Sequence, residues 1–257
     1  MLTHMSLFSG IGANDLAAEW AGFKTVGQCE WADFPTKVLE KHWPDVPRWR
    51  DIHDLTGESI RSRGIKDITV LSGGFPCQPH SVAGERKAST DERDLWPEYR
   101  RIICETRPKW IVGENVAGLL TSESGRFFGG ILRDLAELGF DVGWCGISAE
   151  WVGAAHRRGR VFVVAHSNSH RLQGEIFQDR NGAKGNGRPP EQMDIHSFRG
   201  VFYKGRIWPS EPRIRRVVNG IPNWSHRIKA LGNSIVPHQV YPIYQAIADI
   251  EAQSAGE

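Results

Sequence analysis

One cysteine of this chain lies in a setting that could support chemistry. Cys77 belongs to the stretch GGFPCQPHS at residues 73–81 and follows an apolar run at residues 68–71. That run predicts a buried strand, which places Cys77 just beyond a strand end, where open α/β sheets carry their active sites. A thiolate there, with its pKa lowered by a facing helix N-terminus, would be a nucleophile. The alternative is a buried, unreactive cysteine.

A carboxylate and two guanidinium groups are also expected near strand ends, as Cys77 is. Glu114 follows the apolar run at residues 110–113, so we expect it at another strand end, in the same crevice as Cys77. A buried carboxylate with a raised pKa can deliver a proton. Arg158 and Arg160 are spaced by two beside a further apolar stretch, which would direct both side chains to one face of a strand. A basic surface turn is the alternative for these arginines.

A glycine-rich turn near the start of the chain predicts a nucleotide site. Gly10 and Gly12 follow a short strand predicted at residues 5–8, and Glu30 ends the next one. The glycines would let the backbone approach a ligand, and the carboxylate would take ribose hydroxyls. The third glycine of a pyrophosphate fingerprint is replaced by Ala13, which favours a cofactor without a pyrophosphate. A simple turn is the alternative.

The elements that must position these residues alternate between two kinds. Expected strands lie at residues 5–8, 24–29, 68–71, 110–113, 141–149 and 160–165, and expected helices at 16–21, 34–42, 96–105 and 128–138. This alternation predicts an α/β protein with a doubly wound, largely parallel sheet. Residues 223–257 return to a helical pattern, with a break at 232–234 and a last helix that begins at Pro237.

The charge is unevenly distributed along the chain. Residues 166–229 hold 12 Lys and Arg against 5 Asp and Glu, whereas the whole chain has a formal net charge of only +2. Helix and strand breakers at residues 181–190 predict a small, loop-rich insertion at 166–222. The excess of positive charge indicates a segment that binds a polyanion, with a solvated surface loop as the alternative.

Composition argues against several other classes of protein. The four cysteines form no CxxC pair, and the HxxxH spacing of His166 and His170 has no cysteine pair beside it, so we expect no metal site. We expect a reducing compartment, because the cysteines fit no disulfide framework. The sequence shows neither a signal peptide nor a membrane-spanning apolar run. These features predict a cytoplasmic protein with no membrane partner.

Taken together, these stretches resemble one family, the DNA (cytosine-5) methyltransferases. The matching motifs occur in the family's order over nearly the whole chain: FSGIGA at 8–13, Glu30-Trp31, Asp51-Ile52, GFPCQ at 74–78, ENV at 114–116, the arginines at 158 and 160, and GNS at 232–234. The resemblance implies a Rossmann-like catalytic domain at 1–165, a small target recognition domain at 166–222 and a C-terminal segment at 223–257 that returns to the catalytic domain. It also implies S-adenosyl-L-methionine as cofactor and double-stranded DNA as partner, with a monomer expected.

The resemblance further implies a role for each matched residue. Cys77 would attack C6 of a flipped cytosine, Glu114 would hold the N3/N4 edge and protonate N3, and Arg158 would lie near the base O2 with Arg160 in support. The cofactor would contact Phe8, Gly10, Gly12, Glu30, Trp31, Asp51, Ile52, Pro76, Asn233 and Ser234. DNA would contact Gln78, Ser81, Arg199, Arg206 and Arg213.

Other functions stay open at this point. An RNA methyltransferase of the same fold, which modifies transfer RNA at cytosine C5, is the first alternative. A catalytically impaired DNA-binding relative is the second, suggested by the short recognition segment and by Asp94, which replaces a Gly common in the family. A nicotinamide oxidoreductase is the third, and the absent third glycine opposes it. A restriction-modification pair, a solitary enzyme and a phage-borne enzyme are equally compatible with the sequence.

Overall fold

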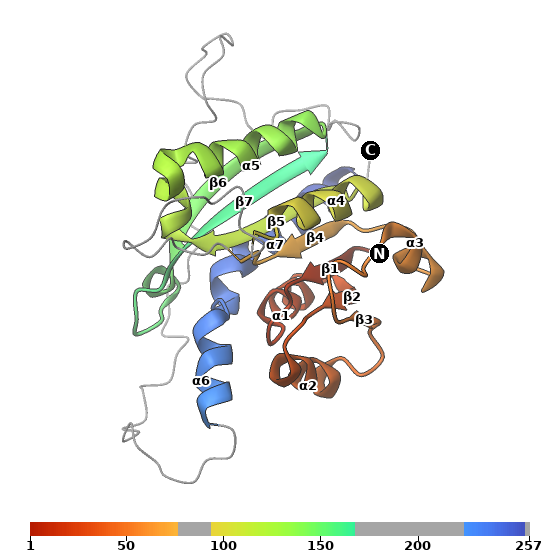
Figure 1. The fold of residues 1–257 in the computed structure, drawn as a ribbon, viewed down its shortest axis with the longest axis horizontal. Helices are drawn as coiled ribbons and strands as arrows, with labels where there is room; N and C mark the ends of the chain where they lie inside the picture. Colours follow the sequence, from red (N-terminus) through yellow and green to blue (C-terminus); the bar gives the residue numbers. More distant parts are fainter. Residues whose placement is uncertain (77–93, 168–223, 255–257) are drawn as a thin grey trace.

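The core of the protein is one mixed seven-stranded sheet (Figure 1). The computed structural model describes residues 1–76, 94–167 and 224–254. The strands lie in the order β3-β2-β1-β4-β5-β7-β6. Their bounds are β1 (Thr3–Leu7), β2 (Lys24–Cys29), β3 (Arg48–Trp49), β4 (Val70–Gly73), β5 (Trp110–Val116), β6 (Phe140–Ser148) and β7 (Gly159–Ser167).

Parallel pairing brings the ends of the first strands to one edge of the sheet. Leu7 is paired with both Cys29 and Gly73, and Gly73 is paired with Gly113. The residues that follow β1, β2 and β4 therefore share this edge with the last part of β5. Strand β7 is antiparallel to β5 and to β6, because β6 and β7 form a hairpin. The expected largely parallel sheet is confirmed, with β7 as its antiparallel member.

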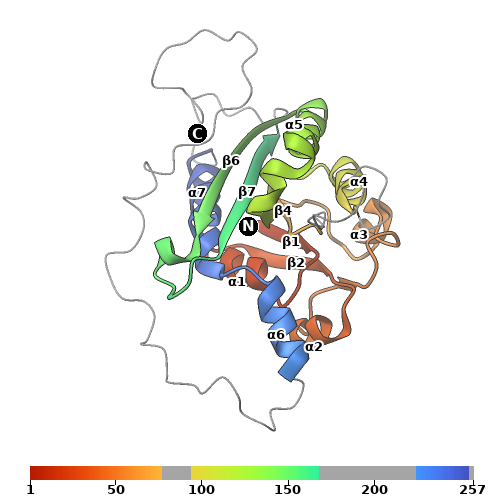
Figure 2. The same ribbon diagram turned by 60° about the vertical axis from the view of Figure 1, so that its left-hand side comes forward.

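Helices cover both faces of the sheet, as a doubly wound fold requires. The helices are α1 (Ala13–Trp20), α2 (Asp33–His42), α3 (Gly57–Ser62), α4 (Trp96–Thr106), α5 (Arg126–Glu137), α6 (Trp224–Asn233) and α7 (Pro237–Ser254). Figure 2 shows α4 and α5 on one side of the sheet and α1 and α7 on the other. Two separate apolar clusters fill these two sides. In the described part of the chain, no helix is long and apolar enough to cross a membrane.

Local chemistry explains where several helices begin and end. Gly12 and Gly22 flank α1 with φ angles of 84° and 87°, a left-handed conformation that glycine adopts without strain. Helix α4 begins at Trp96 with Pro97 in its first turn, where a missing N–H costs nothing. The Oδ1 atom of Asp94 accepts a hydrogen bond from the backbone N of Trp96 at 3.0 Å. Asp94 therefore helps to begin α4.

The structure differs from the sequence expectation in a few elements. Strand β5 continues to Val116, because Glu114, Asn115 and Val116 pair with β7, so Glu114 lies inside the strand rather than after it. The two-residue strand β3 and the short helix α3 were not predicted, since neither is long enough to show a period. Two further segments were also not predicted. They are a 3-10 segment at Ala149–Val152 and the 3-10 turns of Ala117–Gly125, which a kink at residues 122–124 interrupts.

The C-terminal segment packs back onto the first part of the chain. Helix α7 lies against α1, and the two share an apolar cluster that includes Ala17, Ala18, Val240 and Tyr244. The predicted insertion at 166–222 falls outside the described residues except for its first two positions. The domain boundaries stay a prediction.

Candidate active site

The turn after β1 adopts a conformation that leaves room above its backbone. Phe8, Gly10 and Gly12 have φ angles of 53°, 56° and 84°, and a left-handed conformation is unusual for a phenylalanine. A Cβ atom added to Gly12 would lie 2.3 Å from the ring of Trp43, whereas one added to Gly10 would meet nothing within 4 Å. The turn thus packs closely at Gly12 and is open at Gly10, which suits the close approach of a ligand.

Acidic and aromatic side chains lie beside this turn. Glu30 follows β2, and its two carboxylate oxygens accept hydrogen bonds from the backbone N of Gly10 at 2.7 Å and of Ala32 at 2.8 Å. The next side chain, Trp31, is 72% exposed. The backbone bonds fix the Glu30 carboxylate and leave it further lone pairs for a ligand. A ribose beside Glu30 and a base against the open Trp31 ring would fit these groups.

The second predicted pair of cofactor residues follows β3. Asp51 is half-buried, and its Oδ1 atom lies 2.7 Å from Nδ1 of His53. Ile52 is buried, and its carbonyl accepts a hydrogen bond from Arg101 at 2.8 Å. Because β3 pairs with β2, this pair lies on the same side of the site as Glu30.

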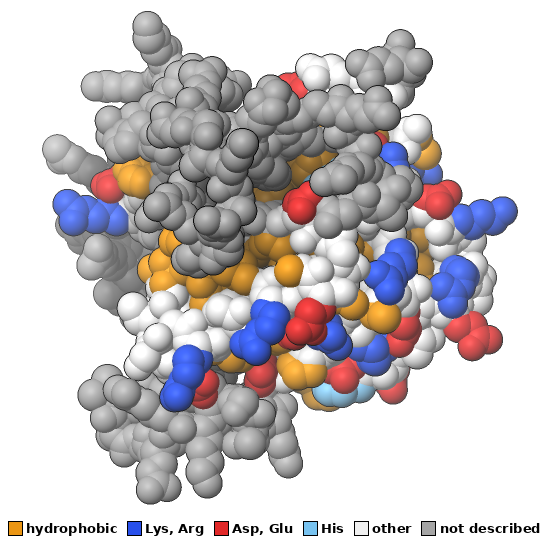
Figure 3. All heavy atoms as spheres, turned by 90° about the horizontal axis from the view of Figure 1, so that it is seen from above, with side chains coloured by type: hydrophobic (Ala, Val, Ile, Leu, Met, Phe, Trp, Pro, Cys, Tyr) orange, Lys and Arg blue, Asp and Glu red, His pale blue; other side chains and the backbone are white. Residues whose placement is uncertain are grey.

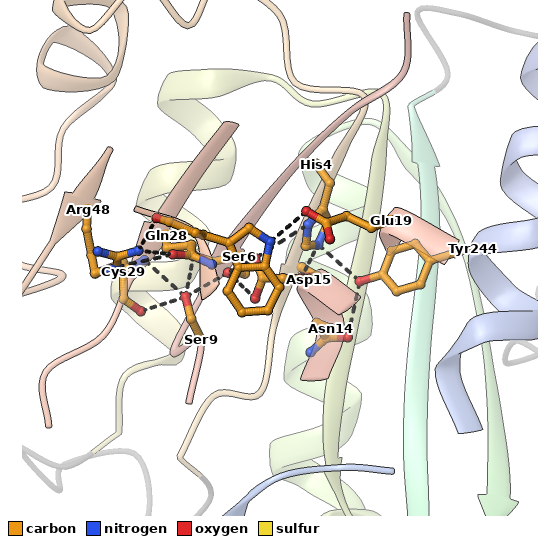
Figure 4. A network of polar contacts seen from close by, with 12 residues as sticks. His4, Ser6, Ser9, Asn14, Asp15, Glu19, Gln28, Cys29, Arg48 and Tyr244 are labelled. Carbon is orange, nitrogen blue, oxygen red and sulfur yellow. Dashed lines mark hydrogen bonds and ion pairs between the residues drawn. The ribbon is translucent and has the colours of Figure 1, made fainter. Parts of the chain in front are cut away.

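A buried polar network supports the turn from below (Figure 4). Ser6 donates a hydrogen bond to Asp15 at 2.9 Å and lies 2.7 Å from the hydroxyl of Ser9. The Ser9 hydroxyl in turn accepts a bond from the backbone N of Cys29 at 3.1 Å. Burial raises the pKa of Asp15 to about 6. These bonds join α1, β1 and the end of β2, and they hold the turn next to Glu30.

The same network extends to the C-terminal helix. His4 is fully buried, and its Nε2 atom lies 2.8 Å from the Ser72 hydroxyl and 3.2 Å from the Tyr244 hydroxyl. Tyr244 donates to Asn14 at 3.1 Å. Burial lowers the pKa of His4 to about 3, so the ring is neutral near pH 7. The sequence analysis did not identify His4 and its partners. A histidine within a short apolar strand could have indicated a buried polar network.

Glu114 is the buried carboxylate of the site. It is 9% exposed, and its Oε1 atom lies 2.8 Å from Nε of Arg160. Burial raises the pKa of Glu114 to about 7, although the charges of Arg160 and Arg158 favour the ionised form. A Cβ atom on Gly74 would lie 2.8 Å from Oε2 of Glu114. The absence of a side chain at Gly74 therefore makes room for this carboxylate.

The neighbouring residue of β5 holds the segment that leads to Cys77. The Asn115 side chain donates a hydrogen bond to the carbonyl of Phe75 at 3.0 Å. The Phe75 ring packs against Trp96 on α4, with 5.3 Å between ring centroids. These contacts fix the backbone directly before Pro76, which is half-buried. The structure thus brings the GFP segment to Glu114 and Asn115, as expected for a shared crevice.

The two candidate arginines have different partners. Arg160 lies in β7 and contacts Glu114. Arg158 precedes β7, and its Nη2 atom donates to the carbonyl of Gly232 at 2.6 Å and to that of Ser234. Arg160, rather than Arg158, is thus the arginine bonded to the candidate catalytic carboxylate. Arg158 holds the end of α6 and the turn before α7, where the predicted cofactor residues Asn233 and Ser234 lie.

The remaining predicted residues lie outside the described part of the chain. They are Cys77, Gln78, Ser81, Arg199, Arg206 and Arg213. Among the cysteines that the structure describes, burial raises the pKa of Cys29 and Cys145 to about 12, which makes both poor nucleophiles. Within residues 1–76, 94–167 and 224–254, no cluster of three or more His, Cys, Asp or Glu could hold a metal ion.

One face of the molecule shows how charge is arranged outside the predicted insertion. In Figure 3, positive and negative side chains are intermingled along part of this face, beside a patch of apolar side chains. Mixed charge of this kind gives no strong attraction to a polyanion. The expected phosphate contacts of the basic segment 166–229 stay a prediction.

Comparison with protein families gives one match that spans most of the chain. The family model described as C-5 cytosine-specific DNA methylase matches residues 2–203. The chain is 35% identical to the Type II methyltransferase M.BsuFI of Bacillus subtilis, over 63% of this chain and 39% of that protein. It is 33% identical to the Type II methyltransferase M.NgoBI of Neisseria gonorrhoeae, over 70% of this chain and 58% of that protein. The match thus spans about half the length of these relatives.

Comparison with solved structures supports the fold. A DNA modification methyltransferase encoded within an E. coli prophage matches with a TM-score of 0.58 at 24% identity, over 66% of this chain and 47% of that one. The DNMT2 structure from Spodoptera frugiperda matches with a TM-score of 0.56 at 20% identity, over 68% and 53%. At these identities the likeness concerns the fold alone.

Proposed function

Because the chain belongs to the C-5 cytosine-specific DNA methylase family, we propose that it transfers a methyl group to C5 of cytosine in double-stranded DNA. The observation that carries this proposal is the buried Glu114. Its carboxyl group has a pKa of about 7 and lies 2.8 Å from Arg160, at the sheet edge where the GFP segment leads to Cys77. A carboxyl group with this pKa can donate a proton near neutral pH.

Cytosine C5 is a poor nucleophile until its ring is activated. The Cys77 thiolate would form a bond to C6 and push electrons towards C5 and N3. Glu114 would donate its proton to N3, which neutralises the charge that builds on the ring. Arg160, bonded to Glu114, would stabilise negative charge on the same edge of the base. After methylation, loss of the C5 proton to a base would form the C5–C6 double bond again. The C6–S bond would break with its electron pair on sulfur, which releases Cys77 as the thiolate, and N3 would return its proton to Glu114.

The turn after β1 fits S-adenosyl-L-methionine as the methyl donor. Phe8, Gly10 and Gly12 supply an open backbone turn, and Glu30 and Trp31 offer a carboxylate and an exposed ring for a nucleoside. When bound, S-adenosyl-L-methionine supplies an activated methyl group. The proposed contacts to this cofactor also include Asp51, Ile52, Pro76, Asn233 and Ser234.

The proposal requires that the target cytosine leaves the DNA stack. Such flipping costs a few kcal/mol, which contacts between protein and DNA must offset. Gln78 and Ser81 follow the candidate nucleophile, and we assign them to DNA contacts beside the flipped base. Arg199, Arg206 and Arg213 belong to the basic segment, whose charges would neutralise phosphates. We place the enzyme in the cytoplasm, where it would act on the cell's DNA as a monomer.

A mass-spectrometric assay for 5-methylcytosine tests the reaction. The protein is incubated with S-adenosyl-L-methionine and unmethylated plasmid DNA, with Cys77→Ser in parallel. We expect 5-methylcytosine with the native protein and none with the variant. Transfer RNA serves as a second substrate. Methylation of the RNA alone would contradict the proposal, as would equal activity of Cys77→Ser.

A further inference from the structure

Gln239 is a buried side chain that has no role in the chemistry proposed above. It is 0% exposed. Its Oε1 atom accepts a hydrogen bond from the backbone N of Val236 at 3.2 Å, and its Nε2 atom donates to the carbonyls of Ile147 at 2.9 Å and Arg158 at 2.8 Å. A backbone N–H only donates and carbonyls only accept, so this orientation of the amide is the one that satisfies all three partners.

Helix capping explains only one of these bonds. Gln239 is the third residue of α7, and a glutamine at this position commonly accepts a bond from the backbone N before the helix. The other two bonds join Gln239 to Ile147 and Arg158, which lie 92 and 81 positions earlier in the chain. They hold the end of β6 and the residue before β7, at the end of the hairpin where a loop joins the two strands. The side chain thus joins α7 to the sheet.

A second set of bonds joins the same two segments, with the donor side chain on the hairpin and the acceptors before α7. The Arg158 side chain donates to the carbonyls of Gly232 and Ser234, just before α7, while the Arg158 carbonyl accepts from Gln239. Each of the two segments therefore holds the backbone of the other with a side chain. Two residues after Arg158, Arg160 contacts Glu114 at 2.8 Å. A shift of the turn at 232–234 would consequently be transmitted to the hairpin end that carries Arg160.

We propose that Gln239 is a positioning residue that holds the turn of Asn233 and Ser234 in register with the Arg160–Glu114 pair. This inference rests on the proposed function, in which the turn contacts S-adenosyl-L-methionine and the pair acts on cytosine. Through Gln239, the cofactor side and the base side of the site keep a fixed relative position. Reactions that join two bound molecules are sensitive to displacements of about 1 Å, which can lower a rate by about 100-fold.

Two substitutions of different chemistry test this role. Gln239→Glu keeps the acceptor for Val236 but removes both donors, and Gln239→Met removes all three bonds at similar volume. For each variant we expect the dissociation constant for S-adenosyl-L-methionine, measured by calorimetry, to rise about tenfold. We also expect the alkaline fall of kcat/KM to move to higher pH, because a displaced Arg160 no longer favours the ionised form of Glu114. A residue that merely stabilises the helix would change neither property.

Gln245 provides the matched control on the same helix. Its Nε2 atom donates to the exposed Asp249 at 2.9 Å, so Gln245→Glu and Gln245→Met should bind the cofactor as the native protein does. Native protein that fails to bind S-adenosyl-L-methionine would refute the proposed function. Native protein that binds it, together with unchanged affinity in both Gln239 variants, would refute only the positioning role.

Hydrogen exchange of the native protein decides the matter even if both Gln239 variants fail to fold. We expect added S-adenosyl-L-methionine to slow amide exchange at residues 230–240 and at 147–160 together. Protection confined to 230–240 would show that the two segments move independently, and it would overturn the proposal.

Discussion

The carboxyl group of Glu114 is subject to two opposing influences. Burial raises its pKa to about 7, while the neighbouring guanidinium groups of Arg160 and Arg158 favour the charged form. The balance leaves both protonation states accessible near neutral pH, which is the condition for efficient proton transfer. A more exposed carboxylate would already have lost its proton at that pH.

The pH dependence of the reaction should report this carboxyl group. Glu114 must be protonated to donate to N3, so we expect kcat/KM to fall as the pH rises through about 7. Glu114→Gln should lower kcat by about 10²- to 10⁴-fold and remove this alkaline fall. Steady-state methylation rates between pH 5.5 and pH 9 measure both effects. Glu137→Gln, at an exposed position of α5, is the control. An unchanged profile in Glu114→Gln would assign the proton to another group.

Gly74 offers a second test at the scale of single residues. Its missing side chain leaves space for Oε2 of Glu114, which a Cβ atom would approach to 2.8 Å. We expect Gly74→Ala to lower kcat by about tenfold or more, with unchanged affinity for S-adenosyl-L-methionine. Gly130→Ala, in α5 with open space around it, should keep full activity and gain about 0.5–1 kcal/mol in unfolding free energy. Parallel kinetics and chemical denaturation distinguish the two variants.

At the scale of elements, the Ser9 hydroxyl joins the turn after β1 to the end of β2. Ser9→Ala leaves the backbone N of Cys29 without its buried acceptor. We expect the free energy of unfolding to fall by about 1–3 kcal/mol and the affinity for S-adenosyl-L-methionine to fall several-fold. Ser62→Ala, at an exposed position of α3, should change neither quantity. Equal affinity for S-adenosyl-L-methionine in Ser9→Ala and in the native protein would show that the Ser9 hydrogen bonds do not support cofactor binding.

The elements also show which parts of the fold and site can be predicted from the sequence. The strands and helices that carry Phe8, Glu30 and Glu114 were predicted, because apolar periods and glycine stops mark them clearly. The different partners of Arg158 and Arg160 could not be predicted, since the bond from Arg158 to Gly232 joins residues 74 positions apart. Local spacing carries no information about such contacts. Roles for Cys77 and the basic segment stay predictions, because Cys77 and residues 168–223 of that segment lie outside the described residues.

At the scale of the whole molecule, binding to DNA should depend strongly on salt. Residues 166–229 hold 12 Lys and Arg against 5 Asp and Glu, whereas the whole chain has a net charge of only +2, so the rest of the chain is net negative. Each phosphate contact contributes about 0.9 to the slope of log affinity against log salt concentration. We expect Arg199→Gln, Arg206→Gln and Arg213→Gln together to flatten this slope by up to about 3. Fluorescence anisotropy at several salt concentrations measures this slope. The control is Arg63→Gln, at an exposed position directly after α3. An unchanged slope would remove these arginines from the DNA interface.

The contact between α7 and α1 also sets an order of events during protein synthesis. Tyr244 on α7 bonds to Asn14 on α1, which the ribosome adds 230 residues earlier. Until α7 emerges, α1 lacks the part of its apolar cluster that α7 supplies, and the turn after β1 lacks part of its support. In a nascent chain interrupted before α7, the proposed cofactor site would therefore be incomplete. Under the proposed function, chains that end before α7 would therefore be unable to methylate DNA.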